Sequence, residues 1–236
     1  MATKLILFDI GYTLLFQNRE KNYQKYVQSL GYDVALEEIT KAYHISDKQF
    51  MRDFKGVFGH DPATFLPWFL GTVNFQLGVR ANLVEQFQTL QKWNDEDSFF
   101  WQPFPFVQKT LTTLKESGYQ LGIISNWDET ARPILEQHGL TQFFDPIVIS
   151  IEFGQSKPSK AIFEHALQLA GIDAAETIYV GDNYYDDVIG ASRVGIKTIL
   201  LNPFERLGIE EIDYDYVIES IEQLPNFLNS RRITNV

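Results

Sequence analysis

The chain has 236 residues, a length that fits one large domain or a domain that carries a sizeable insertion. Hydrophobic residues make up 44% and charged residues 22%, values that exclude a disordered or fibrous protein. The net charge of −11 argues against a nucleic-acid partner, and the absence of cysteine excludes disulfides, zinc–thiolate centres and thiol nucleophiles. Any bound metal must therefore be held by oxygen or imidazole ligands.

We expect no secretory signal in the first residues. Met1 leads directly into a short apolar run that ends at Asp9, without the longer apolar region and cleavage site of a signal peptide. No stretch approaches the roughly 18 consecutive apolar residues that cross a bilayer. We therefore expect a cytoplasmic protein that does not contact a membrane.

Strand-like apolar runs alternate with helical periodicity in two separated parts of the chain. The predicted strands are 5–8, 121–125, 147–150, 177–181, 197–201 and 216–218. The predicted helices around the later strands are 107–117, 129–138, 159–170, 186–194 and 221–228. This alternation predicts an α/β fold with a parallel sheet and helices on both faces.

Residues 17–98 interrupt the alternation. The segment has no convincing buried strand but several helical patterns, punctuated by glycine and proline. It predicts an all-helical domain inserted into a core formed by residues 1–16 and 99–236. The aromatic residues of this insertion recur at helical spacing, and we expect them mainly in its core. They are Phe50, Phe54, Phe58, Phe65, Trp68, Phe69 and Phe75.

Polar residues follow the ends of the predicted strands, where open parallel sheets bind their ligands. Two carboxylates at neighbouring strand ends can share a divalent cation, and Mg²⁺ typically takes one or two carboxylates together with substrate phosphate oxygens. A lysine and a small hydroxyl beside them would counter the charge of a phosphoryl group. In chain order the residues are Asp9, Thr13, Ser125, Asn126, Lys157, Asp182, Asp186 and Asp187.

Four segments give a specific resemblance. They are FDIGYTL at 8–14, IISN at 123–126, KPSKAIF at 157–163, and VGD at 180–182 with DVIGA at 187–191. In this order they resemble the four motifs of the haloacid dehalogenase-like hydrolase superfamily. Helices inserted after the first motif are similar to the helical cap of its first subclass, which contains phosphatases, phosphomutases, a phosphonate hydrolase and 2-haloacid dehalogenases. The resemblance implies a Rossmann-like core with an inserted helical cap domain.

The resemblance also implies roles for the motif residues. Asp9 would be the nucleophile that forms a covalent aspartyl intermediate. Ser125 and Asn126 would hold the transferring group through hydroxyl and backbone donors, and Thr13 has a counterpart in the first motif. Lys157 would neutralise developing charge and hold Asp9 in place.

The implied metal is Mg²⁺. Asp182 would bind it together with Asp9 and the backbone carbonyl of Gly11. Asp187 best matches the second acid of the fourth motif, which orients Lys157 or a metal-bound water, and Asp186 is the adjacent alternative.

Gly11 departs from the family pattern. Phosphatases of the family usually carry a second Asp there, which protonates the leaving oxygen and later activates water. A general acid contributes about 10²- to 10⁴-fold in rate, so its absence should hurt most with alkyl leaving groups and least with aryl or acyl phosphates. Binding of Mg²⁺ should survive, because the family's ligand at this position is a backbone carbonyl.

Other side chains could replace the missing acid. Tyr12 is adjacent, but a phenol with its ordinary pKa of about 10 is a poor base at pH 7. The insertion offers His44, His60 and Asp47. Cationic residues of the insertion could recognise an anionic substrate, although charged helix faces are usually only solvated. These are Arg19, Lys21, Arg52 and Lys55.

Three functional hypotheses follow. The first is a Mg²⁺-dependent phosphatase of a small phosphorylated metabolite. The second is a metal-independent 2-haloacid dehalogenase, since that branch also lacks the second Asp, although Asp182 argues against it. The third is a non-catalytic metabolite-binding or regulatory protein, which would have no reason to keep Asp9, Lys157 and Asp182 together. No heptad seam or symmetric motif indicates a subunit interface.

Overall fold

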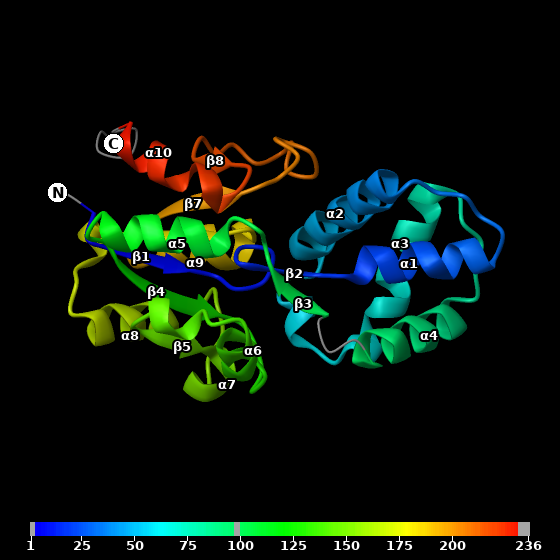
Figure 1. The fold of residues 1–236 in the computed structure, drawn as a ribbon, viewed down its shortest axis with the longest axis horizontal. Coiled ribbons are helices and arrows are strands. Elements are labelled where there is room, and N and C mark those ends of the chain that lie inside the picture. The colour runs from blue at the N-terminus through cyan, green and yellow to red at the C-terminus, as the bar shows by residue number, and fades with distance from the viewer. Residues whose placement is uncertain (1–2, 97–99, 231–236) are drawn as a thin grey trace. The chain divides into compact units, whose positions relative to one another are not determined.

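The computed structural model describes residues 3–96 and 100–230 (Figure 1). The chain forms two compact units. Unit 1 comprises Met1–Phe16, Pro103–Arg206 and Glu211–Val236, and unit 2 comprises Gln17–Gln102 and Leu207–Glu210. The expected boundary between residues 98 and 99 lies outside the described residues.

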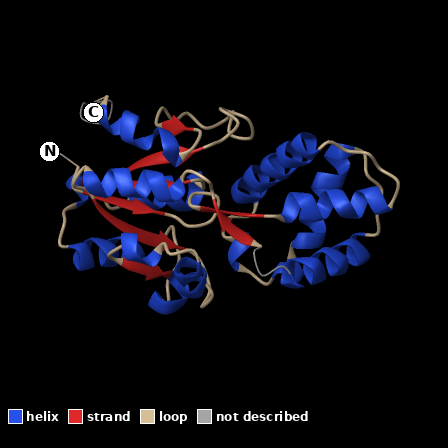
Figure 2. Cartoon of the chain, viewed as in Figure 1, coloured by secondary structure: helices blue, strands red, loops and turns tan. Residues whose placement is uncertain are grey.

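A six-stranded parallel sheet forms the centre of unit 1, as the alternation of strands and helices predicts (Figure 2). Its first strand in sequence, Leu5–Phe8, lies between two neighbours and places Phe8 opposite Ile123 on one side and Val180 on the other. The residues that follow these three positions therefore lie at one edge of the sheet. In spatial order the strands are β5 (Ile147–Ile149), β4 (Gln120–Ser125), β1 (Leu5–Phe8), β6 (Thr177–Gly181), β7 (Lys197–Leu201) and β8 (Val217–Ile218).

Helices cover the sheet of unit 1 (Figure 1). Helix α8 buries Ile162, Phe163 and Ala166 in a core cluster with Leu5 and Leu7 of β1. Ile6 and Phe8, which alternate with these leucines along the strand, are also fully buried, so β1 is buried on both faces and all its residues are apolar. The helices are α5 (Val107–Glu116), α6 (Ala131–Gln137), α7 (Ser150–Phe153), α8 (Lys160–Ala170), α9 (Ile189–Ser192) and α10 (Leu224–Asn229).

Three predicted elements of unit 1 differ in the structure. The helix expected over 221–228 begins with a 3-10 turn over Ile221–Gln223, and α10 follows it. The strand expected over 147–150 ends at Ile149, because Ser150 begins the short helix α7. The helix expected over 186–194 is a π-helical turn over Tyr184–Val188 followed by α9. The Asn183 side chain accepts hydrogen bonds from the amides of Tyr185 and Asp186, and this cap starts the turn earlier than the apolar pattern indicated.

Unit 2 is built on four helices, α1 (Arg19–Ser29), α2 (Leu36–Asp53), α3 (Leu66–Leu77) and α4 (Leu83–Glu96). Phe50, Phe65 and Phe69 are buried in its core, as expected, whereas Trp68 and Phe75 are 64% and 88% exposed. Phe54 and Phe58 are also exposed. The described helices include none long and apolar enough to span a membrane.

A two-stranded sheet of β2 (Leu15–Gln17) and β3 (Trp101–Pro103) forms where the chain passes between the units. The sequence did not predict it, because three residues are too few to establish a period of two.

A histidine of α2 is buried against the segment Leu207–Glu210, which belongs to unit 2. His44 Nε2 donates to the carbonyl of Leu207 at 2.9 Å. Burial, and then the charge of Lys48, lowers the pKa of His44 from 6.5 to about 4. Asp47 raises this pKa by a smaller amount, and Arg19 lowers it.

We expect His44→Gln to make the protein less sensitive to acid. As the pH falls from 7 to 5, the unfolded chain protonates this imidazole and the folded chain does not, which removes about 2 kcal/mol of wild-type stability. Glutamine still donates to the Leu207 carbonyl but does not titrate. Chemical denaturation at pH 7 and at pH 5 gives the free energy of unfolding of both proteins. Between these pH values, the free energy of unfolding of the wild type should fall by about 2 kcal/mol more than that of the variant. A difference that does not change with pH would contradict the expectation.

Candidate active site

Asp9 follows β1 directly, and its position is set by the sheet. Its backbone amide donates to the carbonyl of Val180 at 2.9 Å, so the parallel ladder continues to this residue. Its carboxylate oxygen Oδ1 accepts from Ser125 Oγ at 2.7 Å and lies 2.9 Å from Lys157 Nζ. Within the described ranges no hydrogen bond reaches the second oxygen, Oδ2. One oxygen is thus held by two donors, and the other is available to act as a nucleophile.

Lys157 is buried, with 2% of its side chain exposed. Its ammonium contacts Asp9, lies 2.7 Å from Asp187 Oδ1 and lies 2.8 Å from the Tyr179 hydroxyl. Burial lowers the pKa of Lys157, but the carboxylates of Asp187 and Asp9 outweigh this effect and raise it above its ordinary value. The lysine therefore remains a cation.

Asn126 fixes the backbone of this lysine. Its side-chain oxygen accepts from the Lys157 amide at 2.7 Å, and its side-chain nitrogen donates to the Lys157 carbonyl at 3.0 Å. Because the side chain of Asn126 is used in this way, a backbone donor is the group it could offer to a substrate.

The turn after β6 separates the two candidate acids of the fourth motif. Asp187 bonds Lys157 through Oδ1 and accepts the backbone amide of Asn183 at Oδ2, 3.0 Å away. Asp186 instead accepts from the Asn183 side chain at 3.0 Å. Burial, reinforced by the charge of Asp187, raises the pKa of Asp186 to about 7. The lysine partner is thus Asp187.

Three buried carboxylates could hold a metal ion. Asp9, Asp182 and Asp187 each offer an oxygen, and these oxygens lie within 4.8 Å of one another. Such an oxygen-only donor set fits a hard divalent cation such as Mg²⁺. Gly181 permits this cluster, since a Cβ there would lie 2.2 Å from Asp187 Oδ2.

The segment after Asp9 forms a tight turn. The Tyr12 amide donates to the Leu15 carbonyl at 2.7 Å, and Tyr12 has a left-handed φ of 51°. Thr13 is 1% exposed, and its hydroxyl oxygen has no hydrogen-bond partner among the described residues. A buried hydroxyl without a partner is a group that a substrate oxygen could satisfy.

Two residues that support the site were not predicted from the sequence. Tyr179 lies within the apolar run of β6, a pattern that predicts an aromatic residue of the core. Asn183 lies between Asp182 and Asp186, and an Asn after a strand and before a helix is a recognisable capping signal.

Two of the charged candidates of unit 2, Arg19 and Asp47, bond to each other. Arg19 pairs with Asp47 through two hydrogen bonds, one of 3.1 Å, and with Glu20 at 3.1 Å. Its guanidinium also lies 4.7 Å from the centre of the Tyr43 ring. Arg19 and Asp47 thus form a partly buried ion pair within unit 2.

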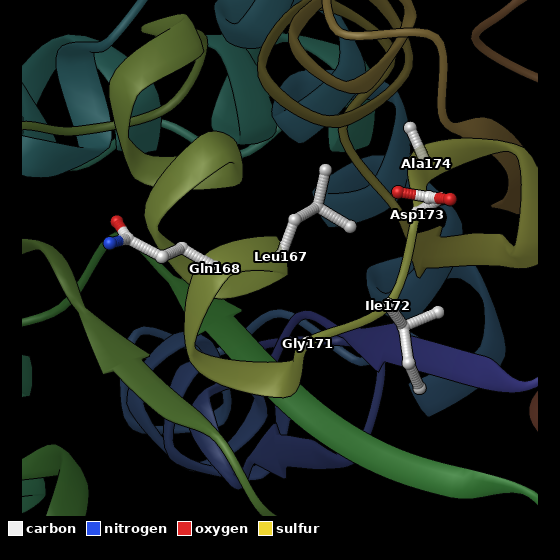
Figure 3. A pocket seen from close by; sticks show the side chains of 6 residues that line it. All are labelled: Leu167, Gln168, Gly171, Ile172, Asp173 and Ala174. Atoms are coloured by element: carbon white, nitrogen blue, oxygen red, sulfur yellow. The ribbon is translucent and has the colours of Figure 1, made fainter.

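A surface pocket of about 310 Å³ lies at the end of α8 (Figure 3). It precedes β6, whereas Asp182 follows that strand, so the pocket is at the opposite edge of the sheet from the Asp9 cluster. Its lining residues are Leu167, Gln168, Gly171, Ile172, Asp173 and Ala174.

Comparisons with known proteins place the chain in a family. A sequence model of the haloacid dehalogenase-like hydrolase family matches residues 6–201. The glyceraldehyde 3-phosphate phosphatase of Methanothermobacter thermautotrophicus is 37% identical over 138 residues, which are 54% of this chain and 59% of that protein. The match therefore covers less than two thirds of that phosphatase. Haloacid dehalogenase-like hydrolase domain-containing protein 3 of Danio rerio is 27% identical over 95% of this chain and 96% of that protein.

Solved structures share the fold over almost the whole chain. A HAD phosphatase from Thermococcus onnurineus has a TM-score of 0.60 at 25% identity. The match covers 98% of this chain and 100% of the phosphatase chain. A 2-haloacid dehalogenase from Pseudomonas syringae has a TM-score of 0.55 at 23% identity, and the match covers 97% of this chain and 99% of the dehalogenase chain. At this identity the match shows a shared fold alone. From the family match and the strand-end cluster we conclude that the chain belongs to the haloacid dehalogenase-like hydrolases.

Proposed function

We propose that this hydrolase is a Mg²⁺-dependent phosphatase of a small phosphorylated metabolite, with unit 1 as the catalytic core and unit 2 as the helical cap. The observation that carries the proposal is the lysine held between two carboxylates. Lys157 bonds both Asp9 and Asp187, and Asp182 completes a buried oxygen cluster. The phosphatase names of several relatives support the same reading.

The buried acids suit Mg²⁺. Asp9, Asp182 and the backbone carbonyl of Gly11 would hold the ion, and their oxygen donors match its preference. When bound, the ion would supply positive charge against the oxygens of the transferring phosphoryl group.

The chain's own residues account for the covalent chemistry. A carboxylate oxygen of Asp9 attacks the phosphorus of a phosphate monoester, and the P–O bond to the leaving group breaks as the new bond forms. The leaving oxygen takes both electrons and then a proton from water. Water next attacks the phosphorus of the aspartyl phosphate, and the bond to Asp9 breaks with its electron pair returning to the carboxylate. The proton that this water loses combines with the hydroxide left by the first step, and inorganic phosphate leaves.

The remaining residues position the phosphoryl group. Lys157 and Ser125 already contact Asp9, so both would face a group bound to it and offset its charge. The hydroxyl of Thr13, which has no partner among the described residues, and the backbone amide of Asn126 are further donors. Asp187 would orient Lys157 during the reaction.

A dehalogenase is the second candidate, because Gly11 leaves no general acid at the position where a phosphatase of this family carries one. Halide leaves without a proton, so such chemistry would tolerate glycine here. The buried carboxylate of Asp182 favours the phosphatase, since a metal-independent displacement has no use for a third acid in the cluster.

Asp9→Asn should lower Mg²⁺-dependent turnover of an aryl phosphate by at least about 10³-fold, because an amide oxygen is a poor nucleophile. Excess chelator should abolish wild-type turnover, and added Mg²⁺ should restore it. Asp173→Asn, at the opposite edge of the sheet, should keep wild-type activity.

Turnover that is equal in wild type and Asp9→Asn would reject the phosphatase. Chloride release from a 2-chloro acid in the presence of chelator would establish the dehalogenase instead.

The glycine at position 11 predicts a strong dependence on the leaving group. The wild-type kcat/KM should be about 10²- to 10⁴-fold higher for p-nitrophenyl phosphate than for glycerol phosphate, because a phenolate leaves without protonation. Gly11→Asp should raise turnover of the alkyl ester more than that of the aryl ester. Equal gains for both substrates would show that proton donation is not what this position lacks.

A further inference from the structure

The hydroxyl of Tyr179 completes the surroundings of the Lys157 ammonium. An ammonium has three N–H donors. Lys157 Nζ lies 2.9 Å from Asp9 Oδ1, 2.7 Å from Asp187 Oδ1 and 2.8 Å from the Tyr179 hydroxyl oxygen. Each donor therefore has one acceptor, and the third acceptor is a neutral group from the middle of β6.

This hydroxyl is itself held in place. It donates to the carbonyl of Ile124 at 2.8 Å, which leaves its lone pairs for Lys157. The Tyr179 ring is fully buried and packs edge-on against Phe163, with 5.4 Å between ring centroids. Ile124 directly precedes Ser125 on β4. One hydroxyl thus ties the lysine to the strand that presents the serine.

Loss of the hydroxyl would leave the ammonium with two carboxylate acceptors and one buried N–H without a partner. A buried donor without an acceptor is unfavourable, so the ammonium would shift toward the carboxylates. Such a shift would change how Nζ faces a group bound to Asp9. Reacting geometries tolerate little displacement of this kind.

We propose that Tyr179 is a positioning residue that holds the Lys157 ammonium between Asp9 and Asp187 for phosphoryl transfer, an inference that rests on the proposed function. Its hydrogen is donated to Ile124, so its action on the reaction passes through the lysine. A change at Tyr179 should therefore affect kcat far more than KM.

Tyr179→Phe tests the proposal, because it keeps the packed ring and deletes only the hydroxyl. We expect kcat for an aryl phosphate to fall about 10- to 100-fold, with KM changed less than about threefold. The matched control is Tyr23→Phe, which deletes another fully buried hydroxyl, one that donates to Asn74 in unit 2 at 2.7 Å. The control should lose thermal stability but keep wild-type kcat. An unchanged kcat in Tyr179→Phe, or an equal loss in Tyr23→Phe, would overturn the proposal.

A second measurement does not depend on the reaction. The ammonium hydrogens of Lys157, followed by NMR and assigned through the side-chain carbons, should exchange slowly with water in the wild type, because all three are bonded and buried. Exchange should be at least about tenfold faster in Tyr179→Phe and unchanged in Tyr23→Phe. Equal exchange in wild type and Tyr179→Phe would reject the positioning role even if the wild type shows no phosphatase activity.

Discussion

A buried lysine, Lys157, needs charged and polar partners, and the rest of unit 1 must bring these partners to it. An ammonium removed from water loses hydration, and only opposite charge and hydrogen bonds can offset that cost. Lys157 recovers it through Asp9, Asp187 and the Tyr179 hydroxyl, and the two carboxylates also keep its pKa above the ordinary value. Since none of these partners is near Lys157 in sequence, the fold must bring four separate segments to one point.

The parallel sheet meets this requirement through its strand order. β1 lies between β4 and β6, so Asp9, Ser125 and Asp182 lie at the carboxyl ends of three adjacent strands. Smaller features then refine the position of each group. The side chain of Asn126 makes two hydrogen bonds to the backbone of Lys157. Gly181 has no side chain and leaves the space that Asp187 occupies. The site therefore depends on backbone register as much as on its charged residues.

The chemistry of the site follows from what this arrangement contains. A held carboxylate, a permanent cation and a cluster of oxygen ligands suit attack on a charged phosphoryl group. If the proposed phosphatase function holds, the glycine at position 11 would leave an alkyl leaving group without the proton donor it needs. The site would then favour substrates whose leaving group needs no proton. In unit 2, Arg19, a candidate substrate contact, pairs with Asp47, a candidate for the missing acid.

Local sequence patterns were sufficient to predict all six strands of the main sheet and the motif residues at their ends. An apolar run bounded by polar residues depends only on neighbouring positions, so β1 and β6 were located to the residue. The same patterns could not choose between Asp186 and Asp187, because neighbouring residues of a helix point about 100° apart and the choice depends on where the turn begins.

Tertiary structure made that choice. The Asn183 cap starts a π-helical turn that directs Asp187 to the lysine. The tertiary structure also showed the contacts of Tyr179, which its apolar neighbours in sequence do not indicate. Its hydroxyl bonds Lys157 and Ile124, which are 22 and 55 residues away in the chain. The sequence by itself determined which residue types stand at the strand ends, because those patterns are local. Only the packed fold decided which of them bond, because hydrogen bonds between distant segments depend on register and orientation.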